Sequence, residues 1–267
     1  MRMTFVKVAL QFAALLLAGA SAFVETAPLR VDIVDRNIRF VDGAGAPIAD
    51  GALNDREAII GDPATGGYRA RIVAVVADPF SDGSVRRLYD VRYFHDASGE
   101  WRSICAAGPQ GLMLAAALPG KWTADGLYQP LSDGAFTFNC SAGAHVKCLR
   151  LGYAPWLKDA AGRSLAAKHQ ACTRMMRADY CGTGRPFTVA GKRIQVLDSN
   201  QPSTFRYGRL EAIWDENGAR CLAQVRAPEV HPMQEVLEAC PRLAAPTTDC
   251  TEERFQADPR AVLANRS

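Results

Sequence analysis

The chain has 267 residues, 48% of them hydrophobic and 22% charged, with a formal net charge of +3 at pH 7. This length is enough for one large domain or two small ones. The small charge, with basic residues interspersed among acidic ones, gives no electrostatic basis for binding nucleic acid or an anionic membrane. We therefore predict no nucleic-acid partner.

Residues 1–22 have the features of a secretory signal peptide. Arg2 and Lys7 give a positive start, an apolar run follows, and Ala20-Ser21-Ala22 matches an A-x-A cleavage site. The run is too short to span a bilayer comfortably, and no later segment reaches 18 uninterrupted apolar residues. We expect a mature chain that starts at Phe23, has no transmembrane segment, and is exported to the periplasm or the extracellular space. The alternative is an uncleaved membrane anchor.

All eight cysteines lie after residue 100, so the N-terminal part must be held together by ordinary packing. An even number of cysteines in an exported protein favours disulfide bonds, although the count does not give the connectivity. The disulfide candidates are Cys105, Cys140, Cys148, Cys172, Cys181, Cys221, Cys240 and Cys250.

Alternation of apolar and polar residues predicts strands in the first half of the chain. Arg30–Ile48 is expected to form a β-hairpin that turns at Asp42–Gly45. Tyr68–Ala77 is rich in β-branched residues and is predicted to be a buried strand. Arg87–Cys105 is predicted to be a second hairpin that turns at Asp96–Gly99.

Further strands are predicted on both sides of the chain's clearest helix. Phe136–Cys140 and Lys147–Leu151 read as short strands before it. After it, Phe187–Leu197 reads as a hairpin that turns at Ala190-Gly191, and Ala212–Cys221 as another.

Residues 164–178 are predicted to form the central helix. Ser164 can cap its start, and the glycines after Cys181 can stop it. Arg174 and Arg177 fall away from the apolar face and are expected to point outward or across. The positions expected to point inward are Leu165, His169, Cys172 and Met176.

Two short helices are predicted near the C-terminus. His231–Cys240 fits a helix, and Asp249 with Glu252 resembles a capping box that starts another. Because Cys172 lies on the buried face of the central helix, we predict a Cys148–Cys172 disulfide, with Cys240–Cys250 closing the C-terminal helices.

Rare residues at ordered spacing surround the central helix. They include Trp101 with Cys105, Gly152-Tyr153, and Arg177 through Gly182. This pattern, from roughly Leu88 to Cys221, resembles the ADYC domain family, exported bacterial proteins named for the tetrapeptide seen here as Ala178-Asp179-Tyr180-Cys181. The resemblance implies export and a cysteine framework but no particular reaction.

The predicted fold is α+β, a mainly antiparallel β body with one central helix (164–178) and short C-terminal helices, stabilised by disulfides. The predicted organisation is a signal peptide (1–22), a β-rich segment (23–87), the ADYC-like domain (88–230) and a short helical extension (231–267).

Two H-x-x-C units, His145 to Cys148 and His169 to Cys172, contain the four ligands of a tetrahedral zinc site. An oxidising compartment favours disulfides instead, and we predict no metal and no cofactor. His169 and Cys172 could also form a thiolate–imidazole nucleophile; the alternative is an oxidised Cys172 beside a hydrogen-bonded core histidine.

A polar cluster at the end of the central helix is either a clamp for a carboxylate or phosphate ligand or a brace for the turn that follows, with Arg177 and Asp179 as the expected bracing pair. The binding candidates in this cluster are Arg174, Arg177, Asp179 and Tyr180.

Two functions fit the sequence. The first is a non-enzymatic binding or structural module of the cell envelope or secretome, whose partner is an unidentified protein or envelope component. The second is an extracytoplasmic hydrolase with a site near His169, Arg174 and Asp179, with His169 and Asp179 as the catalytic candidates. Asp179 paired with Asp198 or Glu211 is a glycosidase-like variant of this second function.

Overall fold

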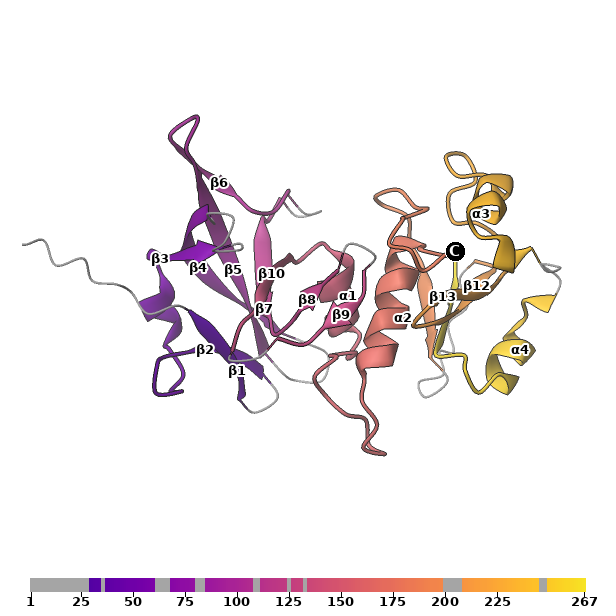
Figure 1. The fold of residues 1–267 in the computed structure, drawn as a ribbon, viewed down its shortest axis with the longest axis horizontal. Helices are drawn as coiled ribbons and strands as arrows, with labels where there is room; N and C mark the ends of the chain where they lie inside the picture. Colours follow the sequence, from indigo (N-terminus) through magenta and orange to yellow (C-terminus); the bar gives the residue numbers. More distant parts are fainter. Residues whose placement is uncertain are drawn as a thin grey trace, which may run out of the picture.

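The computed structural model describes residues 29–34, 37–60, 68–79, 85–107, 111–123, 126–131, 134–198, 208–244 and 249–267. The predicted signal peptide and its cleavage site lie outside these residues. The N-terminal strands occupy one end of an elongated molecule and the C-terminal elements the other, with helix α2 between them (Figure 1).

The first half of the described chain is built from strands. One short 3₁₀ turn, Asp50–Leu53, interrupts them. The strands are β1 (Arg30–Val34), β2 (Asn37–Val41), β3 (Arg56–Ile60), β4 (Tyr68–Pro79), β5 (Val85–His95), β6 (Glu100–Ser103), β7 (Leu114–Leu118), β8 (Lys121–Trp122), β9 (Tyr128–Gln129) and β10 (Thr137–Cys140).

The second half combines helices with a second sheet. Its elements are α1 (Ala144–Arg150), α2 (Ala166–Arg177), β11 (Gln195–Asp198), β12 (Leu210–Asp215), β13 (Gly218–Leu222), α3 (Met233–Ala239), the 3₁₀ turn η3 (Pro241–Leu243), α4 (Glu252–Ala257) and β14 (Leu263–Arg266).

Every paired strand in the described chain is antiparallel. The larger sheet has the order β10-β7-β5-β4-β3 with β6 also on β5, and the smaller has the order β11-β14-β12-β13. Helix α2 packs against strands of the smaller sheet and against α1. The predicted α+β class, with its central helix and short C-terminal helices, is confirmed.

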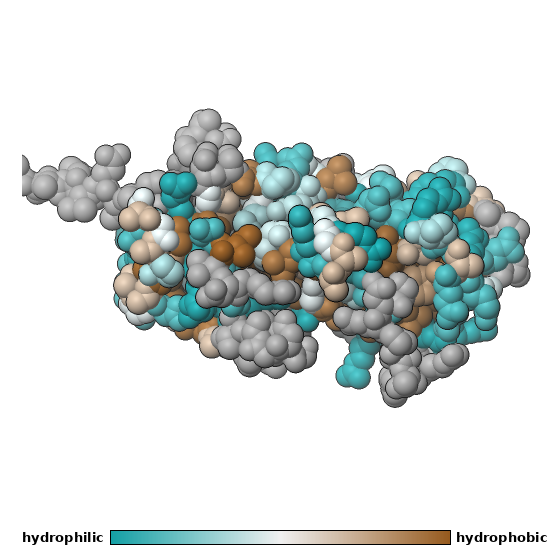
Figure 2. Space-filling model, turned by 90° about the horizontal axis from the view of Figure 1, so that it is seen from below, coloured by the Kyte–Doolittle hydropathy of each residue, from teal (hydrophilic) through white to brown (hydrophobic). Residues whose placement is uncertain are grey.

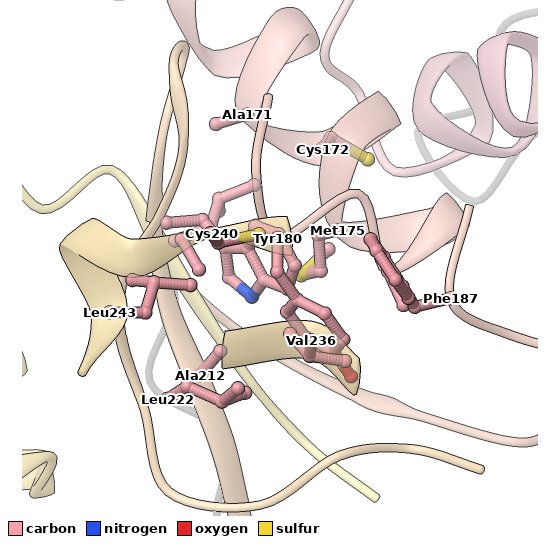
Figure 3. Close-up of a cluster of buried hydrophobic side chains, with 14 of the residues drawn as sticks. Ala171, Cys172, Met175, Tyr180, Phe187, Ala212, Leu222, Val236, Cys240 and Leu243 are labelled. Atoms are coloured by element: carbon pink, nitrogen blue, oxygen red, sulfur yellow. The ribbon is translucent and has the colours of Figure 1, made fainter. Parts of the chain in front are cut away.

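Of the four hydrophobic clusters among the described residues, the two largest lie in the N-terminal part and beside α2. In the N-terminal core, Phe40 meets Tyr89 and Phe136 edge to face, with ring centroids 5.0 and 5.1 Å apart. The core beside α2 includes Met175, Tyr180 and Trp214. Figure 3 shows Met175 and Tyr180 close to Val236 of α3 and Leu222 of β13. On the face shown in Figure 2, hydrophobic residues are interspersed with hydrophilic ones, and the hydrophilic colour predominates toward the C-terminal end.

All eight cysteines form disulfides: Cys105–Cys140, Cys148–Cys172, Cys181–Cys240 and Cys221–Cys250. The predicted Cys148–Cys172 bond is therefore confirmed. The predicted Cys240–Cys250 bond is wrong. Cys240 follows α3 and joins the turn after α2, whereas Cys250 precedes α4 and joins β13.

Two predicted elements of the second half were also wrong. The segment predicted as a strand at Lys147–Leu151 belongs to helix α1, which buries Val146, Cys148 and Leu149. The predicted hairpin at Phe187–Leu197 does not form, because β11 pairs with β14, nearly seventy positions further along the chain. Strand β14 was not predicted from the sequence.

Other predictions need smaller corrections. Asp42–Gly45 turns the chain after β2, whereas the link between β1 and β2 falls on residues 35–36, outside the described part. Strand β4 is only partly buried. Thr251, not Asp249, caps α4, since the side chain of Thr251 accepts a hydrogen bond from the Arg254 amide.

No helix in the part of the chain that the structure describes is long and apolar enough to span a membrane.

Candidate functional site

Helix α2 ends at Arg177 and is capped by Ala178, within one residue of the predicted end. Ala178 adopts the left-handed conformation with φ 50°, and its amide donates to the Met175 carbonyl at 3.1 Å. A non-glycine residue rarely takes this conformation, and Ala178 holds it while completely buried. The helix therefore ends at Arg177, four positions before Cys181, and a turn follows.

Asp179 braces this turn from within. One of its carboxylate oxygens accepts from Nη1 of Arg174 at 2.5 Å and from the Gly184 amide at 2.8 Å, and the other accepts from the Thr183 amide at 3.1 Å. Arg174 also donates to the Glu216 carbonyl at 2.9 Å. The two side chains are only 3% and 1% exposed.

Of the two orientations expected for Arg174, outward or across, the outward one is wrong, because its guanidinium is held inside by Asp179 and by the Glu216 carbonyl. Arg177 is half-buried, and its Nη2 donates to the Gly184 carbonyl. The bracing partner of Asp179 is thus Arg174 rather than Arg177.

Tyr180 belongs to a second buried polar group. Its ring stacks on Trp214 with centroids 5.4 Å apart, and its hydroxyl donates to Glu211 at 3.1 Å while accepting from the Arg226 amide at 3.0 Å. Burial, with the Glu211 carboxylate next, raises the pKa of Tyr180. Tyr180 therefore stays protonated and serves as a hydrogen-bonded core residue.

Arg226 and Glu211 form a two-pronged ion pair, with Nε–Oε2 3.0 Å and Nη2–Oε1 2.8 Å. The same guanidinium donates to the carbonyls of Met175 and Met176 at 2.7 and 3.1 Å, so it also satisfies the open end of α2. Neither side chain is more than 3% exposed.

The last residue of the tetrapeptide and the glycine after it lock the turn to neighbouring elements. Cys181 is bonded to Cys240. A Cβ at Gly182, where φ is +74°, would lie 1.9 Å from the Asn217 carbonyl oxygen, so only glycine fits without a shift. Each residue from Ala178 to Cys181 therefore has a role in holding the fold together: a helix cap, a buried ion pair, a buried hydrogen bond and a disulfide.

His169 and His145 lie in a separate aromatic cluster. Nδ1 of His169 donates to the Tyr153 carbonyl at 2.7 Å, and Nδ1 of His145 donates to Oδ1 of Asn139 at 2.7 Å. The two rings are 6.2 Å apart, and His145 stacks on Trp122 at 4.1 Å. Burial lowers the pKa of His169 to about 4 and that of His145 to about 3. Both are neutral at pH 7.

The two H-x-x-C units do meet, but their sulfurs are joined in the Cys148–Cys172 disulfide. Within the described ranges, no three His, Cys, Asp or Glu side chains are grouped to hold a metal ion.

His169 is not placed to act together with Asp179. Its Nε2 atom is buried and has no hydrogen-bond partner among the described residues. About 12 Å of helix separates His169 from the end of α2 next to Asp179, too far for direct hydrogen bonding.

The three carboxylates considered as an acid–base pair each have a cation of their own. Asp179 pairs with Arg174, and Glu211 pairs with Arg226. Asp198 accepts from Nζ of Lys168 and from the Tyr153 hydroxyl, on the wall of an open polar pocket of about 640 Å³.

Sequence reasoning missed a second open pocket, of about 500 Å³, between the larger sheet and α1. Leucine side chains of β5 and β7 form its floor, and Lys147 and Arg150 lie at its rim. A helical reading of residues 144–150 would have placed both cations on one face, because they are three positions apart. Because Lys147–Leu151 was predicted to be a strand, the shared face of Lys147 and Arg150 was not recognised.

Comparison with known proteins identifies one family. The family model described as ADYC domain matches residues 53–228, more than half of the chain. A search of curated proteins found no match, and neither did a search of solved structures.

Proposed function

We propose that this chain, which belongs to the ADYC domain family, is an exported, non-enzymatic module that binds a component of the cell envelope or of the secreted fraction. Four disulfides and the signal-like N-terminus support export, because disulfides persist in oxidising compartments. The near-neutral charge supports a partner other than nucleic acid.

One observation carries the non-enzymatic part of the proposal. The polar residues of the family tetrapeptide are buried and bonded inside the fold, with Asp179 on Arg174 and Tyr180 on Glu211. A catalytic acid or base must reach a substrate atom within hydrogen-bonding distance. These contacts favour a scaffold role for the motif over the alternative hydrolase site at His169, Arg174 and Asp179.

Export is tested by mass spectrometry of the protein recovered from the periplasm and the medium. The expected first residue is Phe23, and the expected number of free thiols under denaturing, non-reducing conditions is zero. Full-length chain with reactive thiols, found only in the cytoplasm, would contradict export.

The non-enzymatic role is tested with ester, peptide and glycoside substrates. We expect no turnover by the wild type above that of a heat-denatured sample. Hydrolysis that His169→Gln abolishes, while the variant keeps its far-UV and near-UV circular dichroism, would establish the hydrolase instead.

A further inference from the structure

The 500 Å³ pocket beside α1 has an apolar floor that reaches the surface. Leu88 and Leu114 are buried beneath it, whereas Val76 is 39% exposed and Leu112 is 52% exposed. These four aliphatic side chains come from β4, from β5, and from β7 with the residues just before it. A surface of this kind gains free energy when an alkyl chain covers it and displaces water.

The rim of the same pocket is positively charged. Lys147 and Arg150 lie three positions apart on α1 and both line the opening. Arg150 is paired with Asp78 at 3.0 Å and also donates to the Ser141 carbonyl. Lys147 forms no ion pair or side-chain hydrogen bond with any residue that the structure describes, which leaves one positive charge uncompensated at the rim.

An apolar floor beneath an uncompensated ammonium group matches one ligand chemistry. The ligand must have an alkyl chain to cover the floor and a terminal anion for Lys147, because Arg150 is already paired with Asp78, which also lines the pocket. The pocket's volume lies in the range usual for small-molecule sites. The 640 Å³ pocket also has a lysine, Lys158, with no ion pair among the described residues. Its lining differs in that it holds two aspartates, Asp159 and Asp198, and lacks a floor of four aliphatic side chains.

We propose that the pocket formed by Val76, Leu88, Leu112 and Leu114, with Lys147 and Arg150 at its rim, binds a single-chain alkyl carboxylate of the fatty-acid type. This inference rests on the proposed binding role and names the class of ligand. The carboxylate pairs with Lys147 at the rim, and the chain lies along the aliphatic floor.

The test is calorimetric titration of the mature, disulfide-bonded protein with hexanoate, octanoate, decanoate and the neutral decanol. Affinity should rise about fourfold for each added CH₂ group, the factor that corresponds to burying one methylene. Lys147→Gln should weaken decanoate about fivefold, as expected for one surface ion pair, and should leave decanol unchanged. Leu112→Ser should weaken both.

Two matched variants control for general surface effects. Lys158→Gln removes an exposed lysine at the other pocket, and Leu127→Ser removes a leucine that is 40% exposed on a different loop. Neither should change decanoate binding. All four substitutions are at surface positions, so unchanged melting curves would show that folding is intact.

Absence of saturable decanoate binding below its micelle-forming concentration would overturn the inference. So would affinities that neither Lys147→Gln nor Leu112→Ser alters. If Leu112→Ser weakened decanoate binding and Lys147→Gln did not, pairing of the carboxylate with Lys147 would be ruled out. Turnover of 4-nitrophenyl decanoate, in contrast, would refute the non-enzymatic role, so the two failures are distinguishable.

Discussion

The N-terminal core and the core beside α2 bury different kinds of side chain. The N-terminal core is built from aromatic rings that pack mostly edge to face, namely Phe40, Tyr89, Phe136 and Phe138. The described residues of this cluster include no buried ion pair. At the other end, buried ion pairs frame the hydrophobic cluster. An aromatic core tolerates shape-conserving changes, whereas a buried ion pair fails when one partner is removed, because the other charge is left unpaired.

The disulfides are also distributed unequally between the two halves of the molecule. Cys105–Cys140 is the only disulfide among the described strands of the larger sheet, and the other three lie from α1 onward. Burying charges gives little net stability even when they are well paired. Three of the four disulfides lie in the half that also holds the buried ion pairs.

Breaking the Glu211–Arg226 pair should have the largest effect. Arg226→Ala removes both prongs of the pair and two donors to the end of α2, so the free energy of unfolding should fall by about 3–5 kcal/mol. Urea denaturation measures this change. Arg185→Ala, which removes a 54% exposed partner of Glu235, should cost less than about 1 kcal/mol. Equal losses in the two variants would contradict the contrast between buried and exposed pairs.

Removing the link between α1 and α2 should come next. The double variant Cys148→Ala with Cys172→Ala opens a bond between residues 24 positions apart, which should lower the free energy of unfolding by about 3 kcal/mol. In reductant, wild type and variant should converge. Ready alkylation of Cys172 in the native, unreduced protein would show that this bond is absent.

Acid should lower the free energy of unfolding through His169, which lies on α2, and not through the N-terminal aromatic core. Burial lowers the folded pKa of His169 to about 4, below the ordinary value of 6.5. The unfolded chain therefore binds the proton first, so this contribution is complete above pH 6.5 and is lost as the pH falls toward 4. The loss should be on the order of 3 kcal/mol for His169.

Urea denaturation of wild type and His169→Gln at pH 7, 5 and 4 measures this loss. Glutamine cannot be protonated in this range, so the variant should be less stable at pH 7 but less sensitive to acid. The same pH dependence in both proteins would rule out His169 as its source.

Local patterns allowed prediction of the local elements. The period of the apolar residues located α2, and alternation around a turn located the hairpins at Arg87–Cys105 and Ala212–Cys221. The pairing of β11 with β14 depends on contacts between distant segments, which no local pattern contains. The same limit explains why Cys148–Cys172, joining neighbouring helices, was predicted correctly and Cys240–Cys250 was not.

The sequence indicated a polar cluster at the end of α2 but not the environment of its residues. The brace was expected to pair Asp179 with Arg177, because a helical projection places Arg174 outside by default. Inside the fold, the Arg174 guanidinium donates to the carbonyl of Glu216, which lies 42 positions further along the chain. Whether an arginine clamps a ligand or braces the fold is decided by such distant partners.

The smallest expected effect distinguishes a brace from a clamp at Asp179. Asp179→Asn keeps the shape of the side chain and leaves Arg174 buried without its counter-charge, so the free energy of unfolding should fall by about 1–3 kcal/mol. If Arg174, Arg177 and Asp179 instead formed a ligand clamp, stability would be nearly unchanged. A melting curve identical to wild type would therefore contradict the brace.

The chain contains a matched control for this prediction. Asp159 also accepts from two backbone amides, those of Ala161 and Arg163, and from the Arg163 guanidinium at 2.8 Å. The Arg163 side chain, however, is 71% exposed, whereas that of Arg174 is 3% exposed. Water can replace the carboxylate at Arg163 but not at Arg174, so Asp159→Asn should shift the melting temperature much less than Asp179→Asn. Because the two aspartates make the same kinds of contact, the difference between their melting shifts measures what burial adds to the brace.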